Sequence, residues 1–210
     1  MKRAYDILIA AAGILLLSPV LIFLAVLVRI KLGAPVLFRQ TRPGLHAQPF
    51  TLYKFRTMTD ERNAAGKLLP DGERLTHLGR FLRSTSLDEL PQLYNVLNGE
   101  MSIVGPRPLY LKYLSYYTER EKKRHSVRPG ITGWAQIHGR NHLPWNERLA
   151  LDVWYVENHT LLLDLEILAK TFWQVIHKEG VAPNTDEIEP DMDQERRERH
   201  ADRQLKCPQQ

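Results

Sequence analysis

Residues 7–28 read ILIAAAGILLLSPVLIFLAVLV, a run of 22 residues without a charged side chain. At ~1.5 Å per residue, a helix of this length can cross a hydrocarbon core of about 30 Å. Ser18-Pro19 stands near the middle of the run. Proline donates no backbone hydrogen bond and clashes with the preceding turn. We therefore expect the helix to bend there, with the Ser18 hydroxyl bonded to a freed carbonyl.

Basic residues flank this run at both ends, with Lys2 and Arg3 before it and Arg29 and Lys31 after it. Basic flanks favour the cytoplasmic side of a membrane. A kinked helix that enters the bilayer and returns on the same face satisfies both flanks. An ordinary span with a proline kink is the alternative, and these residues alone do not choose between the two.

The rest of the chain has the composition of an ordinary globular domain, so we expect one domain besides the membrane element. The net charge is +5, yet residues 181–210 are acidic overall and poor in apolar side chains, which predicts a disordered charged tail. The basic remainder suits an anionic partner such as lipid head groups or phosphates, or is simply a soluble basic surface. No nucleic-acid-binding motif is found, so no nucleic acid is expected as a partner. Cys207 is the single cysteine, which excludes an internal disulfide.

The local patterns predict a mainly α fold with a small β-hairpin, an α+β class. The hairpin is expected over residues 36–40 and 50–55, with its turn at Arg42-Pro43-Gly44. Residues 60–74 and the glycine-rich stretch 128–140 are predicted as loops. Helices are expected over residues 78–83, 88–98, 108–124, 144–157 and 161–178. The four tyrosines of the third helix form either a core face or a membrane-interface belt, and residues 161–168 are either buried or dip into the bilayer surface.

The stretch Arg83-Ser-Thr-Ser-Leu-Asp88-Glu89-Leu-Pro91 places two adjacent carboxylates at a predicted helix start. Helix capping explains acids at such a position without any catalytic role. The cations Lys54, Arg83 and Arg107, however, stand in turn-rich segments rather than on a solvated helix face. Arginine and lysine bind phosphate oxygens, a carboxylate can coordinate Mg²⁺, and an aspartate can attack phosphorus. The pattern therefore favours phosphoryl chemistry.

Several ordered blocks give the chain a family resemblance. They are Ser18-Pro19; Arg42-Pro43-Gly44; Tyr53-Lys54-Phe55-Arg56-Thr57-Met58; Ser86-Leu-Asp88-Glu89-Leu-Pro-Gln92-Leu; Met101-Ser-Ile-Val-Gly105-Pro106-Arg107-Pro108; and Arg128-Pro-Gly130-Ile-Thr-Gly133-Trp-Ala-Gln136. Each block is weak alone, but in this order they are highly specific. From residue 1 to about residue 180 the chain resembles the small monotopic phosphoglycosyl transferases of the bacterial sugar transferase family.

The resemblance implies a re-entrant membrane helix over residues 1–32, broken at Ser18-Pro19, and a cytosolic catalytic domain over residues 33–180. The charged tail over residues 181–210 lies outside the resemblance. It implies a protein on the cytoplasmic face of the bacterial inner membrane, in contact with membrane lipid. Interfacial amphipathic helices are expected to assist the first segment. The oligomeric state is left open.

The resemblance also implies the chemistry. Asp88 matches the family nucleophile and Glu89 its partner near Mg²⁺. The remaining residues expected to bind phosphate or substrate are Lys54, Arg83, Arg107, Arg128, Gln136 and Arg140. The donor is a UDP-sugar, the acceptor is undecaprenyl phosphate, and UMP leaves while a phospho-sugar stays on Asp88. Such a step begins the assembly of a bacterial polysaccharide or glycoconjugate, and the sequence does not select the sugar.

Two rival functions predict different results. A glycosyl transferase that moves sugar without its phosphate releases UDP instead of UMP. A membrane-tethered scaffold, which holds anionic partners on its basic surface, needs neither carboxylate.

Overall fold

The computed structural model describes residues 2–139, 143–177, 192 and 195–196. Its helices are α1 (Lys2–Leu32), α2 (Asp71–Arg74), α3 (His77–Ser84), α4 (Gln92–Asn98), α5 (Glu119–Lys122), α6 (Trp134–Ile137), α7 (Trp145–Asn158) and α8 (Leu161–His177). The strands are β1 (Leu37–Pro43), β2 (Pro49–Phe55), β3 (Ser102–Val104) and β4 (Gly130–Thr132). Short 3₁₀ turns are η1 (Leu45–Ala47), η2 (Leu87–Glu89), η3 (Leu111–Tyr116) and η4 (Lys123–Ser126). The fold is thus mainly helical with small sheets, as predicted.

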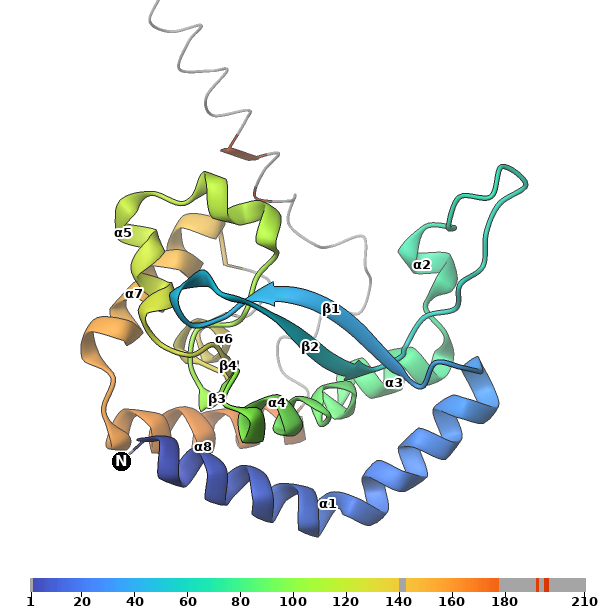
Figure 1. The fold of residues 1–210 in the computed structure, drawn as a ribbon, viewed down its shortest axis with the longest axis horizontal. Coiled ribbons are helices and arrows are strands. Elements are labelled where there is room, and N and C mark those ends of the chain that lie inside the picture. The colour runs from blue at the N-terminus through green and yellow to red at the C-terminus, as the bar shows by residue number, and fades with distance from the viewer. Residues whose placement is uncertain (1, 140–142, 178–191, 193–194, 197–210) are drawn as a thin grey trace, which may run out of the picture.

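Helix α1 is one long apolar helix that carries Pro19 in its interior, and by length and composition it can cross a membrane. Figure 1 shows that it bends near its middle. Pro19 cannot donate to the carbonyl of Leu15, four residues earlier. The Ser18 hydroxyl donates to that carbonyl instead, at 2.8 Å, so the predicted back-bond is present.

Both halves of α1 contact the same folded body. In the first half Asp6 and Ala10 are buried, and Ala10 packs into the main core. In the second half Leu24 and Val28 are buried beside Phe55. The side turned away from the body is apolar and open, including the following side chains: Leu8, Leu15, Leu16, Ile22, Phe23 and Ile30. A helix exposing so much apolar surface requires an apolar surrounding.

The predicted hairpin is present as β1 and β2, which pair antiparallel from Leu37 opposite Phe55 to Pro43 opposite Pro49. A second pair, β3 and β4, is parallel and was not predicted. Within the predicted loop, the described residues 128–139 contain the strand β4 and the helix α6. Their glycines serve close backbone packing: a Cβ on Gly130 would lie 2.1 Å from the amide nitrogen of Gly105. Three-residue strands buried on both faces also lack the alternation that marks a strand in a sequence.

The prediction of a single helix over residues 108–124 is wrong. The segment divides into η3, α5 and η4, because Tyr117 is extended and Thr118 begins a new helix through a capping box with Glu121. Tyr113 and Tyr117 are buried in a cluster with the α7 residue Trp145, which fits the core interpretation for those two tyrosines.

The other predicted helices correspond to α3, α4, α7 and α8, and α4 ends at Gly99 in the left-handed conformation. Helix α8 is amphipathic: Asp164 and Ile167 are buried, whereas Leu162 and Phe172 are 79% and 70% exposed. Its first turn meets the start of α1, where Asp164 pairs with Lys2 (Figure 1). The predicted loop over residues 60–74 is largely exposed and contains α2.

The predicted disorder of the tail, residues 181–210, falls mostly outside the described residues and stays a prediction. Of the tail residues described, Met192 is buried in the cluster of Tyr113 and Trp145. Arg196 lies with its Nη2 2.6 Å from Glu121 Oε1.

Candidate active site

Asp88 and Glu89 lie on the 3₁₀ turn η2, which leads through Pro91 into α4. Ser86 precedes the turn in the left-handed conformation, with φ 55°, and its side chain caps neither η2 nor α4. The two acids do stand at a helix start, as predicted, but Ser86 and Glu89 form no capping box there. A non-glycine residue in this conformation costs about 1–2 kcal/mol, and such strain is concentrated at functional sites.

Glu89 is held by two cations from distant parts of the chain. Its Oε1 accepts hydrogen bonds from Lys54 Nζ at 2.6 Å and from Arg107 Nη2 at 2.7 Å. Lys54 lies on β2, and Arg107 lies in the Gly105-Pro-Arg-Pro segment that follows β3. Burial alone would raise the pKa of Glu89, but the charges of Arg107 and Lys54 outweigh it and hold that pKa below its usual range. Glu89 is therefore a fixed anion that orients both cations.

Asp88 is buried, with 6% of its surface exposed, and is less tightly paired than Glu89. Lys54 Nζ lies 3.9 Å from Asp88 Oδ2, which is an ion pair but not a hydrogen bond. Burial raises the pKa of Asp88, Lys54 opposes this, the neighbouring Glu89 raises the pKa further, and the net shift is upward. Among the described residues no hydrogen bond to either Asp88 oxygen is found, and a carboxylate in this state retains lone pairs for attack.

Arg83 reaches this site from the last turn of α3. Its Nε donates to Thr57 Oγ1 at 3.1 Å, and its charge acts to lower the pKa of Asp88. Helix α3 lies close enough because Gly79 faces the backbone of Thr57: a Cβ there would meet the Thr57 carbonyl oxygen at 1.9 Å. The structure thus brings together five predicted residues: Lys54, Arg83, Asp88, Glu89 and Arg107.

A supporting ion pair was missed by sequence reasoning. Arg124 on η4 and Asp152 on α7 are both buried, and Arg124 Nη2 lies 2.7 Å from Asp152 Oδ2. The same Nη2 donates to the backbone carbonyl of Arg107 at 2.6 Å, which fixes the segment that carries Arg107. In the sequence Arg124 belongs to a basic run that is typical of a solvated surface, so no local signal marked it.

The remaining predicted residues are placed differently. Arg128 donates from Nε to the carbonyl of Gly99 at 2.8 Å, a contact that ties β4 to the end of α4. The side-chain amide of Gln136 is buried next to Gly133 and has no hydrogen-bond partner among the described residues. Arg140 lies outside the described residues. Substrate contact by these three stays a prediction.

The fit to Mg²⁺ depends on the substrate. Among the described residues, no group of three or more His, Cys, Asp or Glu side chains is arranged to hold a metal. Mg²⁺ is usually bound by one or two protein carboxylates, such as Asp88 and Glu89, and its other ligands are waters and substrate phosphates. The residues thus fit a metal that binds together with a phosphate-bearing ligand.

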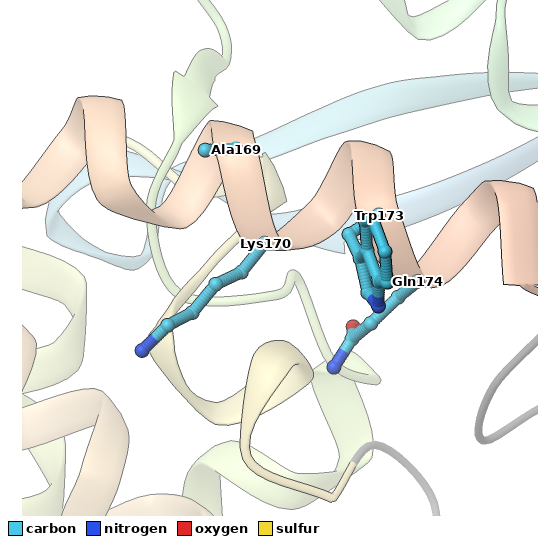
Figure 2. A pocket seen from close by; sticks show the side chains of 4 residues that line it. All are labelled: Ala169, Lys170, Trp173 and Gln174. Carbon is cyan, nitrogen blue, oxygen red and sulfur yellow. The ribbon is translucent and has the colours of Figure 1, made fainter.

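A hollow on the surface of α8 is separate from these residues. Figure 2 shows its lining, Ala169, Lys170, Trp173 and Gln174. Lys170 already bonds Glu166, and Gln174 donates to the carbonyl of Ile137, so their polar groups are occupied. Neither Asp88 nor Glu89 lines this hollow, so the candidate active site is the one at Asp88.

The site combines a buried carboxylate, a second carboxylate hydrogen-bonded to two cations, and a further arginine close by. Enzymes that act on phosphate groups use sites of this class. Residues 1–178 match the family model described as bacterial sugar transferase. The chain therefore belongs to the bacterial sugar transferase family, and it is a transferase.

Curated relatives agree. The uncharacterized sugar transferase EpsL of Bacillus subtilis is 55% identical over 86% of this chain and 90% of its own. The exopolysaccharide production protein ExoY of Sinorhizobium fredii is 39% identical over 85% of this chain and 87% of its own. The UDP-glucose:undecaprenyl-phosphate glucose-1-phosphate transferase of Escherichia coli is 42% identical over 83% of this chain, but the match spans only 40% of that longer protein.

Proposed function

We propose that this enzyme transfers a sugar 1-phosphate from a UDP-sugar to undecaprenyl phosphate and releases UMP, with a covalent phospho-sugar intermediate on Asp88. The observation that carries the proposal is the buried Asp88 carboxylate beside Glu89, whose Oε1 is bonded by Lys54 and Arg107. Relatives named for such transfers to undecaprenyl phosphate, with glucose, galactose or N-acetylgalactosamine, support it. The proposed donor class is therefore a UDP-hexose.

In the first step an Asp88 oxygen attacks the β-phosphorus of the donor. The bond from that phosphorus to the oxygen bridging it to the α-phosphate breaks, and UMP leaves with the electron pair. Little covalent work is needed in such a reaction, so positioning and charge neutralisation supply most of the rate. Arg107 and Lys54 are oriented by Glu89 to face the phosphate oxygens, and Arg83 adds charge from α3.

In the second step a phosphate oxygen of the lipid attacks the phosphorus bound to Asp88. The bond to the carboxylate breaks, Asp88 is restored as an anion, and a polyprenyl diphosphate sugar forms. Mg²⁺, bound by Asp88 or Glu89 together with phosphate oxygens, would neutralise part of the diphosphate charge.

We further propose that α1 enters and leaves the membrane on the cytoplasmic face. A helix that crossed about 30 Å of hydrocarbon would put its ends on opposite sides. Here Asp6 near one end and Val28 near the other are both buried against the same body. The lipid phosphate lies at head-group depth, so an enzyme embedded in one leaflet meets the acceptor without extracting it.

Nucleotide analysis tests the reaction. The purified chain is incubated with UDP-hexoses, polyprenol phosphate and Mg²⁺, and UMP is the expected product; UDP as the sole nucleotide would instead establish a glycosyl transferase. With donor alone, mass spectrometry should find a phospho-sugar on Asp88. Asp88→Asn should lose turnover and the adduct, whereas the exposed Asp71→Asn should retain both. Wild-type turnover in Asp88→Asn would refute the nucleophile.

Thiol labelling tests the topology. In a Cys207→Ser background, a cysteine added before residue 1 should resist an impermeant reagent applied from outside the cell. Labelling from outside would establish an ordinary span.

A further inference from the structure

Arg42 is a second arginine held close to Arg107. Strand register places Arg42 opposite Phe50 and Lys54 opposite Phe38, so both cations project from the same face of the hairpin. The guanidinium carbon of Arg42 lies 3.8 Å from the ring centroid of Tyr110. Tyr110 follows Arg107 by three residues, and the charge of Arg107 acts on Arg42. The hairpin therefore delivers a further cation to the segment that carries Arg107.

No carboxylate compensates the charge of Arg42 in the described part of the chain. Its Nη2 donates to the neutral Gln40 Oε1 at 2.6 Å, and its Nε is buried without a hydrogen-bond partner. Burial and the like charge of Arg107 lower its pKa, although Tyr110 opposes this. The buried Arg124 nearby is paired with Asp152, whereas Arg42 is only partly buried. A partly buried cation without a paired anion costs free energy, and a phosphate ligand would remove that cost.

The stereochemistry of the proposed reaction identifies the phosphate group that Arg42 would bind. Displacement at phosphorus places the attacking and leaving oxygens roughly in line. In the first step UMP departs from the side opposite Asp88. In the second step the lipid phosphate must attack from the side opposite Asp88, which is the same side. The departing phosphate of UMP and the arriving phosphate of the lipid therefore occupy one position in turn.

We propose that Arg42 and Arg107 form this shared phosphate subsite, which takes the α-phosphate of the donor in the first step and the phosphate of the lipid acceptor in the second. The inference rests on the proposed function, and it assigns to Arg42 a role in both half-reactions. Arg107 links the subsite to the carboxylates through Glu89.

The experiment measures each half-reaction separately with Arg42→Gln. Adduct formation is followed with UDP-sugar alone, and discharge of the preformed adduct is followed after polyprenol phosphate is added. Loss of a charge-assisted hydrogen bond should slow both steps by about 10-fold to 100-fold. The matched control is Arg39→Gln: Arg39 lies on the same strand, stacks on Tyr53 and is exposed on the other strand face, so both rates should remain near wild type.

Every outcome decides the matter. Slowing of both steps supports the shared subsite. Slowing of one step alone overturns it and leaves Arg42 with that phosphate only, and unchanged rates overturn any role for Arg42. If Arg42→Gln does not fold, Tyr110→Leu removes the ring that holds Arg42 and should slow both steps by a smaller factor. A wild-type chain that forms no adduct would instead refute the proposed function.

Discussion

Replacing Lys54 with methionine should move the pH dependence of adduct formation. Asp88 attacks as the anion, so the rate falls on the acid side as Asp88 is protonated. Lys54 opposes that protonation through its charge, 3.9 Å from Asp88 Oδ2. Without Lys54, the pKa of Asp88 rises further above its ordinary value, and the acid limb should move to higher pH.

The structure bounds the size of this shift. Two unit charges 3.9 Å apart, at an effective dielectric constant near 20, interact by about 4 kcal/mol. Lys54 retains 21% of its side-chain exposure, so water screens part of this energy. Arg107 and Arg83 also remain to favour the anion. We therefore expect the acid limb to move upward by an amount that corresponds to only part of this energy.

The assay is single-turnover adduct formation with saturating UDP-sugar and no acceptor, followed across the acidic to neutral range. Lys67→Met serves as the control, because Lys67 is exposed in the loop before α2 and lies apart from the carboxylates. The Lys54→Met rate at the plateau should also fall, since a phosphate-facing charge is lost. An acid limb that stays in place or moves to lower pH would refute the electrostatic assignment of Lys54.

Three further predictions concern stability, measured by tryptophan fluorescence during thermal unfolding in detergent. Arg124→Met leaves Asp152 buried without its partner and should cost about 3–5 kcal/mol, whereas Arg124→Met with Asp152→Leu should recover most of it; equal losses in both would contradict the pairing. The Asp6 carboxylate accepts hydrogen bonds from the Ser102 hydroxyl and the Ile103 amide. Asp6→Ala leaves both donors buried without a partner and should lower the free energy of unfolding by about 1–3 kcal/mol. An unchanged unfolding temperature would argue against this role of Asp6. Pro19→Ala should destabilise the protein despite the better helix propensity of alanine, because a straight α1 loses packing worth ~1.5–3 kcal/mol per buried side chain; a gain in stability would show that the bend is not needed.

Structural features that depend on neighbouring residues could be predicted from the sequence. The bend at Pro19 and the Ser18 back-bond follow from proline chemistry within one helical turn. The hairpin follows from alternation around a turn, although its turn is displaced to Gly44–Gln48. The segment 108–124 has helical spacing, yet it does not form one helix. An N-cap at Thr118 divides it, and the tertiary packing of Tyr113 and Tyr117 decides where each short helix ends.

The apolar helix broken by a proline and the adjacent pair of acids can be inferred from the sequence alone, because length, composition and neighbouring residues carry that information. What surrounds those acids depends on the packing of distant segments and is seen in the folded molecule alone. Lys54 and Arg107 lie 35 and 18 residues from Glu89 and bond the same oxygen. Arg124 fixes Arg107 from a run that reads as surface charge. Electrostatic energy depends on distance in space, and packing of separate segments sets those distances.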